Sequence, residues 1–110
     1  MFRRFSGSVL LLAGLACAAQ AQQAGHVLLS RTATTGASFD ECMRRSEATL
    51  LKEGFNVNRG SSFIGGTSGA VSAQIICLPG NIHVMIVVGP APDTAEAFMT
   101  SISNTWQSVI

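Results

Sequence analysis

The chain has 110 residues, of which 12% are charged, and its formal net charge is +1. It contains neither a basic patch nor a series of stacking aromatic residues, so we do not expect nucleic-acid binding. This length allows one small domain with one modest hydrophobic core.

Residues 1–21 have the parts of a signal peptide. Arg3-Arg4 gives a positive start, an apolar run follows over 9–19, and Ala19-Gln20-Ala21 offers small residues at the two positions that a signal peptidase reads. We predict cleavage after Ala21, a single mature domain over residues 22–110, and periplasmic or secreted localisation. The apolar run is too short for stable membrane insertion, and the mature chain has a formal charge of −1 because the leader removes two of the seven basic residues.

A lipoprotein with its lipid on Cys17 is the alternative to this cleavage. Such signals usually have Leu three residues before the Cys and a small residue two before it, whereas Gly14 and Leu15 stand there. Cleavage after Ala21 is therefore favoured.

Cys42 and Cys77 remain in the mature chain, an even number in an oxidising compartment. We expect them to form a disulfide, which would stabilise the domain by about 3–4 kcal/mol through loop closure. Two free buried thiols are the alternative if the geometry forbids the bond. The spacing does not resemble a Cys-x-x-Cys redox pair.

The first half of the mature chain predicts a strand and a helix. Residues 25–33 are a short apolar run typical of a strand. Ser38 and Glu41 form a capping box that begins a helix, which Gly54 ends. The charged residues of this helix lie largely away from its apolar stripe, which indicates a solvated face rather than an active site.

The segment GSSFIGGTSGAV, residues 60–71, partly matches two catalytic motifs. A phosphate loop needs Lys where this chain has Gly66, and it should open a helix. A nucleophile elbow centred on Thr67 needs a helix after it, whereas a strand is predicted here. The glycines favour a hairpin.

Two further strands and a helix complete the chain. Residues 71–78 alternate between apolar and polar, and a turn at Pro79-Gly80 leads into a strand over 82–88, so that Cys77 pairs with Ile82. A second capping box at 93–96 begins the last helix, whose apolar residues recur at helical spacing.

These elements predict an α+β fold in the order β-α-β-β-(β)-α. The short turn permits only an antiparallel hairpin. We expect a two-layer sandwich, with an antiparallel sheet of three to four strands and two helices on one face.

The sheet face without helices is the predicted interaction site. Antiparallel sheets normally show polar residues on such a face, and contiguous apolar surface usually marks a contact. The residues expected there are Ile76, Leu78, His83, Met85 and Val87. The leading hypothesis is therefore a binding or assembly module rather than an enzyme, with an unknown protein or a second copy as partner and a sheet-to-sheet homodimer as the simplest version.

A small hydrolase or metal-binding protein, using the Thr67/Ser68 loop or His83, is the alternative. No His, Cys or acidic cluster has metal-ligand spacing, so neither a metal nor another cofactor is expected. Met43, Met85 and Met99 suit soft copper ligation beside His83, but filling of the core is favoured. The acids at 40–41 and 93–96 are explained by helix capping.

Cys42, Gly54, Gly65, Cys77 and the segment Val87–Pro90 carry a resemblance. Over residues 38–109 the chain resembles small uncharacterised secreted bacterial proteins with a two-cysteine α+β domain. The resemblance implies the fold and the compartment, and it implies no activity.

Overall fold

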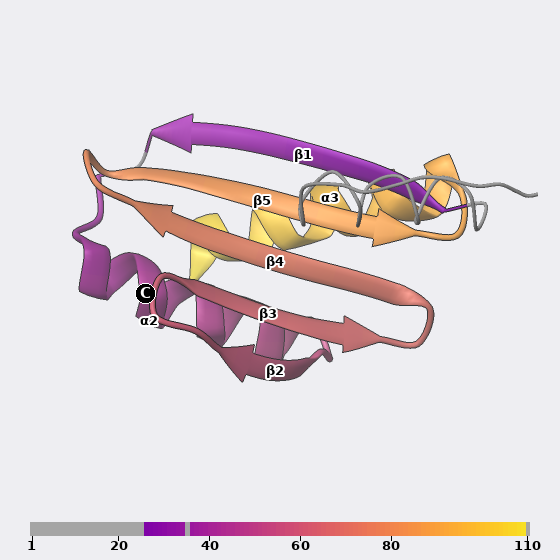
Figure 1. Ribbon diagram of the computed structural model, residues 1–110, viewed down its shortest axis with the longest axis horizontal. Helices are drawn as coiled ribbons and strands as arrows, with labels where there is room; N and C mark the ends of the chain where they lie inside the picture. The colour runs from indigo at the N-terminus through magenta and orange to yellow at the C-terminus, as the bar shows by residue number, and fades with distance from the viewer. Residues whose placement is uncertain (1–25, 35, 110) are drawn as a thin grey trace, which may run out of the picture.

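The computed structural model describes residues 26–34 and 36–109, so the predicted leader and the alternative at Cys17 lie outside it. Seven elements form an α+β fold (Figure 1). They are β1 (Val27–Thr34), α2 (Phe39–Lys52), β2 (Asn56–Arg59), β3 (Phe63–Ser68), β4 (Val71–Leu78), β5 (Ile82–Gly89) and α3 (Pro92–Ser108). Neither helix of the described part is long and apolar enough to cross a membrane.

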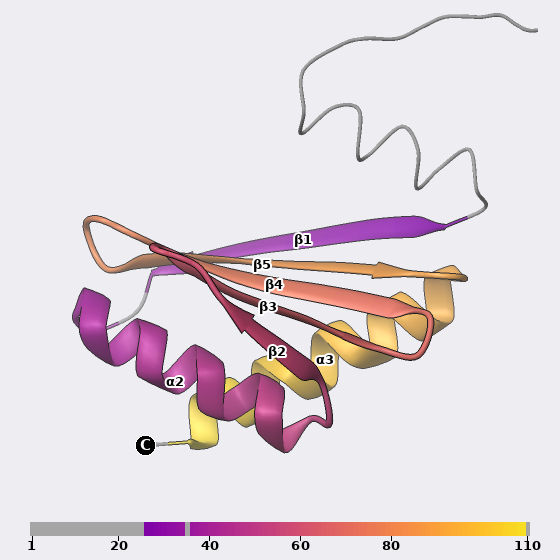
Figure 2. The same cartoon turned by 60° about the horizontal axis from the view of Figure 1, so that its bottom comes forward.

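The strands form one antiparallel sheet in the order β1-β5-β4-β3-β2. Both helices cover the same face: α2 lies mainly against β2, β3 and β4, and α3 against β5 and β1 (Figure 2). The predicted α+β class with an antiparallel sheet is confirmed, but the sheet has five strands rather than three to four. The extra strand is β2, a short edge strand whose sequence Asn-Val-Asn-Arg has too few apolar residues to give a strand pattern.

Only one of the two predicted helix caps is found in the structure. Ser38 caps α2, because its Oγ accepts a hydrogen bond from the backbone N–H of Glu41 at 3.2 Å. The second capping box was wrong: the cap is Ala91 rather than Asp93, without a side-chain hydrogen bond, and α3 begins at Pro92, two residues earlier than predicted. Proline fits the first helical position because its missing N–H would have no partner there.

The turn between β4 and β5 has one residue more than the sequence predicted. Leu78 pairs with Ile82 and Cys77 pairs with His83, so the turn is Pro79-Gly80-Asn81. Gly80 and Asn81 adopt positive φ values of 81° and 61°. Because side chains alternate along a strand, this shift of one residue moves every β5 side chain to the opposite face from the one predicted.

The core lies between the sheet and the helices, and the disulfide links its two layers. Met43 and Leu50 of α2 and Ile102 and Trp106 of α3 are buried against the sheet. Cys42 and Cys77 are bonded with their Cα atoms 6.1 Å apart, as predicted. At a sequence separation of 35, this bond stabilises the fold by about 3–4 kcal/mol in the loop-closure account.

Gly66 is a position of close backbone approach inside this fold. A Cβ atom built on Gly66 would lie 2.4 Å from the backbone oxygen of Asn56 and 3.2 Å from the Cβ of Phe55. The neighbouring Gly65 would place its Cβ no closer than 3.4 Å to any atom outside its immediate neighbours. Gly66 is therefore explained by the packing of β2 on β3, with no need for a phosphate.

We expect Gly66→Ala to lower the free energy of unfolding by about 1–3 kcal/mol, the usual range for overpacking in a filled interior. Gly65→Ala is the matched control, and it should change stability much less because its methyl group meets ordinary contacts. Urea denaturation of the two oxidised variants measures the difference. Equal stability of both variants would contradict the close approach at Gly66.

Candidate functional site

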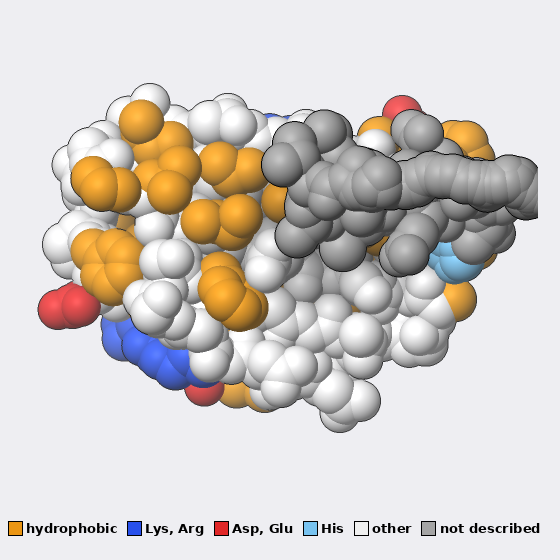
Figure 3. All heavy atoms as spheres, viewed as in Figure 1, with side chains coloured by type: hydrophobic (Ala, Val, Ile, Leu, Met, Phe, Trp, Pro, Cys, Tyr) orange, Lys and Arg blue, Asp and Glu red, His pale blue; other side chains and the backbone are white. Residues whose placement is uncertain are grey.

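The sheet face turned away from the helices, here called the open face, carries an apolar band. Ile76 and Leu78 of β4 lie on it, as predicted. The other large apolar members are Leu28, Phe63, Ile82, Val84, Ile86 and Val88. Leu28 and Leu78 are the most exposed of them, at 37% and 38%, and Figure 3 shows apolar side chains gathered over these strands.

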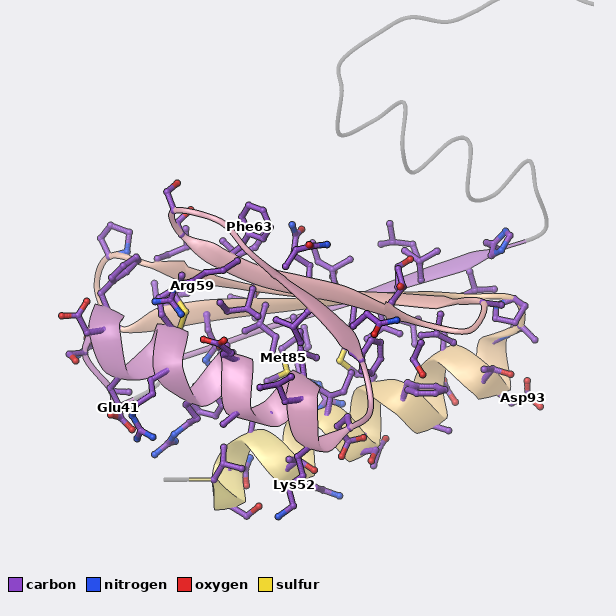
Figure 4. All side chains as sticks on the ribbon, turned by 90° about the horizontal axis from the view of Figure 1, so that it is seen from below. Glu41, Lys52, Arg59, Phe63, Met85 and Asp93 are labelled. Atoms are coloured by element: carbon purple, nitrogen blue, oxygen red, sulfur yellow. A yellow bond between two sulfur atoms is a disulfide. The ribbon has the colours of Figure 1, made fainter. Side chains whose placement is uncertain are left out.

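Three residues predicted for the open face are on the other side of the sheet. His83, Met85 and Val87 are only 5%, 2% and 1% exposed and belong to the buried layer beneath the helices. Figure 4 shows Met85 between the sheet and the helices and Phe63 on the opposite side. The prediction of an apolar open face holds because β5 is apolar on both sides, but its β5 members are Ile82, Val84, Ile86 and Val88.

The open face carries no charged or histidine side chain among the described strands. Its polar members are Ser30, Thr32, Thr34, Asn56, Asn58, Thr67, Ser72 and Gln74. They lie mostly on the two edge strands and near the β3–β4 turn, so the apolar band runs along the middle of the sheet. A hollow of about 510 Å³ lies beside it, where Gly65 leaves space between Phe63, Gln74 and Ile86.

The Thr67/Ser68 segment forms a hairpin and not an elbow. Strand β3 continues to Ser68, and Gly69-Ala70 connects it to β4. Thr67 pairs with Ser72 on the open face, whereas His83 pairs with Cys77 on the buried face. The two side chains are thus on opposite sides of the sheet and about 17 Å apart along β4. The fold does not bring Thr67 to His83.

A second candidate site lies on the helix side, where His83 meets the two helices. The His83 ring stacks on Trp106 of α3, with 4.3 Å between ring centres and 24° between planes. The guanidinium carbon of Arg45 on α2 is 4.6 Å from the Trp106 ring centre. Trp106 Nε1 donates a hydrogen bond of 3.3 Å to Ser46 Oγ, which fixes the indole ring.

Strand β1 adds a second arginine to this cluster. Arg31 Nη1 donates a hydrogen bond of 2.9 Å to Ser103 Oγ, and Ser103 in turn donates to Met85 Sδ at 3.6 Å. Together these side chains line a cavity of about 290 Å³. We call it the basic pocket and define it by Arg31, Arg45, His83, Met85, Ser103 and Trp106.

Two buried polar atoms of the basic pocket have no hydrogen-bond partner, His83 Nδ1 and Arg45 Nε. Buried polar atoms in folded proteins are nearly always paired, so each such exception calls for an explanation. Burial, and then the positive charge of Arg45, lower the pKa of His83 below its ordinary value of 6.5. His83 is therefore neutral at pH 7.

The sequence predictions did not find the basic pocket. Its members come from four elements that are far apart in the sequence, so no spacing rule joins them. One signal was present: Arg31 alternates with Leu29 and Ala33, and all three point to the helix side of β1. A charged residue on the apolar side of a strand is unusual and indicates a polar partner beneath it.

Metal ligation finds no support in the described residues. No group of three or more His, Cys, Asp or Glu side chains lies close enough together there to hold a metal ion. Met43, Met85 and Met99 are all buried in the core, in agreement with the favoured interpretation as core residues.

Comparison with known proteins does not assign the chain to a family. No family model matches the chain, and no match is found among curated proteins. The candidate sites are therefore argued from their geometry alone.

The lowered pKa of His83 predicts a pH-dependent stability. The unfolded state binds a proton near pH 6.5, whereas the folded state resists it, so the free energy of unfolding should fall as pH decreases through 6.5. The loss continues down to the folded pKa, with a slope of at most about 1.4 kcal/mol per pH unit. Urea denaturation between pH 7.5 and 5.5 measures it.

His83→Gln is the control, because glutamine does not titrate and His26 is kept in both proteins. The variant should lose the pH dependence that wild type shows over this window. An equal slope in both proteins would assign the effect to other groups.

Proposed function

We propose that this protein is an exported assembly module that forms a homodimer through the open face. The observation that carries the proposal is the uncharged apolar band on that face, from Phe63 to Leu28 across the middle strands. Exposed contiguous apolar surface of this kind marks interaction sites on proteins. The polar residues on the edge strands give the arrangement of an interface with an apolar centre and a polar rim.

A second copy is the partner that fits this surface without further requirements. In a dimer with two-fold symmetry the same patch meets itself, so any charge near the axis would face a like charge. The open face has none among the described residues. Two twisted antiparallel sheets also pack face to face with their strands about 30° apart, which interleaves their side chains.

The size of the sheet supports a modest interface. Five strands spaced about 4.8 Å apart, each rising about 3.3 Å per residue over at most eight residues, cover on the order of 600 Å² in projection. Stable interfaces bury about 800 Å² of accessible surface per partner, and protruding side chains increase accessible area above the projected area. The open face is thus large enough for a dimer only if most of it is used.

Export is the second part of the proposal. The leader sequence and the Cys42–Cys77 bond both support an oxidising compartment, periplasmic or extracellular. Activity as a hydrolase is not proposed, because none of the described residues that line the hollow beside Thr67 has a titratable side chain.

Export predicts a defined N-terminus. When the full sequence is expressed in a bacterium, the mature protein should begin at Gln22, and its intact mass should be that of residues 22–110 less two hydrogens for the disulfide. Mass spectrometry under non-reducing conditions measures this. A lipid-modified chain that begins at Cys17 would contradict cleavage after Ala21 and would support processing as a lipoprotein.

The dimer proposal predicts opposite effects for two adjacent residues of β5. Ile86 is at the middle of the open face, between Ser30 and Gln74, so Ile86→Glu should keep the fold and weaken the dimer at least tenfold. Val87→Glu places a charge in the core and should instead unfold the protein. Light scattering after size exclusion, over a concentration series of oxidised protein, measures the mass.

Asn104→Glu adds the same charge to the exposed side of α3 and serves as the control, with no effect on association expected. Circular dichroism verifies that each variant is folded. A wild-type protein that stays monomeric at every concentration would sink the homodimer proposal. A dimer that Ile86→Glu leaves intact would place the interface on another surface.

A further inference from the structure

The basic pocket has features that a structural role alone does not require. Two arginines from different elements, Arg31 and Arg45, line the same cavity, and no acidic side chain of the described residues lines it with them. Bringing like charges to one partly buried cavity raises the energy of the folded state unless something of opposite charge offsets it. Glu41 Oε2 lies 4.0 Å from Arg45 Nε, too far for a hydrogen bond, and Glu41 is outside the cavity lining and also binds Arg44.

The unpaired atoms indicate what the cavity lacks. His83 is 95% buried, with only 5% of its surface exposed, and its Nδ1 has no partner. Arg45 Nε is likewise buried and without a hydrogen bond. A guest with oxygen acceptors would accept hydrogen bonds from Arg45 and from neutral His83 in the tautomer that carries its proton on Nδ1, and it would balance the guanidinium charges.

We propose that the basic pocket binds a small organic carboxylate. The guanidinium groups match the planar, two-oxygen geometry of a carboxylate. The same cavity presents Met85, Ala33 and the indole of Trp106, which suit a hydrocarbon portion next to the charged group. Inorganic phosphate would leave these apolar atoms without contacts, so an organic anion is favoured over it.

The volume limits the size of the guest. At about 290 Å³ the cavity lies at the lower end of the range of about 300–1,000 Å³ that is typical of small-molecule sites. The guest is therefore a carboxylate with a short carbon chain and not a long lipid or a peptide segment.

The pocket is held in place before any guest arrives. Arg31 is fixed by Ser103, and Arg45 is fixed over Trp106, which is itself fixed by Ser46 and by stacking on His83. Side chains ordered in advance lose little entropy when a ligand binds. The pocket lies on the helix side of the sheet, so this inference does not depend on the open face or on the dimer.

Trp106 provides a direct readout, because it is the one tryptophan of the chain and lines the pocket. We would titrate the oxidised protein at pH 7 with butyrate, succinate or inorganic phosphate at constant ionic strength and record tryptophan fluorescence. Saturable changes with butyrate or succinate, and weaker binding of phosphate, are expected. Isothermal titration calorimetry verifies the affinities independently of fluorescence.

Arg31→Gln and Arg45→Gln should each weaken carboxylate binding at least tenfold. Arg31→Lys should restore part of the affinity, because it restores the charge without the planar fork. Arg44→Gln removes the same charge from the neighbouring position on α2, outside the pocket lining, and should leave the affinity unchanged. If these arginines only stabilised the fold, the variants would change the free energy of unfolding, and the wild-type protein would show no carboxylate binding for them to weaken.

Three results would overturn the proposal. They are the absence of saturable binding of either carboxylate by wild type, binding of phosphate as tight as that of both carboxylates, and an affinity that Arg31→Gln leaves unchanged. If Arg45→Gln does not fold, Arg31→Gln decides alone, because Arg31 is on the edge strand β1 and this substitution removes its side-chain hydrogen bond to Ser103 without breaking the core.

Discussion

The register between β4 and β5 is the constraint on which the rest of the structure depends. The turn at Pro79-Gly80-Asn81 pairs Cys77 with His83 and turns both side chains toward the helices. One residue fewer in the turn would put His83 on the open face and remove it from Trp106. The basic pocket and the composition of the open face are therefore both consequences of three residues at one end of the sheet.

Much of the fold followed from the sequence, and the register did not, for a physical reason. The helices and the β3–β4 and β4–β5 hairpins came from apolar spacing, glycines and alternation, which are local signals, although the cap of α3 was wrong. The Cys42–Cys77 bond came from the even number of cysteines. Register is normally specified by an apolar face that must be buried. Strand β5 is apolar on both sides, so its sequence does not show which side is buried. The left-handed conformation of Asn81, which lengthens the turn, is too uncommon to be expected from the sequence.

The candidate sites differ in how far the sequence could have revealed them. The apolar character of the open face was predictable because either register of β5 supplies it, although only Ile76 and Leu78 were placed correctly. The basic pocket depends on contacts between elements that are distant in the chain, such as Arg31 with Ser103. Tertiary contacts of this kind leave no periodic signal in a single sequence.

Because of where the disulfide lies, the geometry of the basic pocket depends on whether Cys42 and Cys77 are oxidised. Cys42 lies three residues before Arg45 on α2, and Cys77 is the cross-strand partner of His83. One covalent bond thus holds the helix that carries the guanidinium at a fixed place over the strand that carries the imidazole. In the reduced chain that clamp is open, and only noncovalent contacts through Trp106 hold the two groups together. The carboxylate site that we propose would then form fully only after oxidation, a difference that ligand titration of the reduced protein measures.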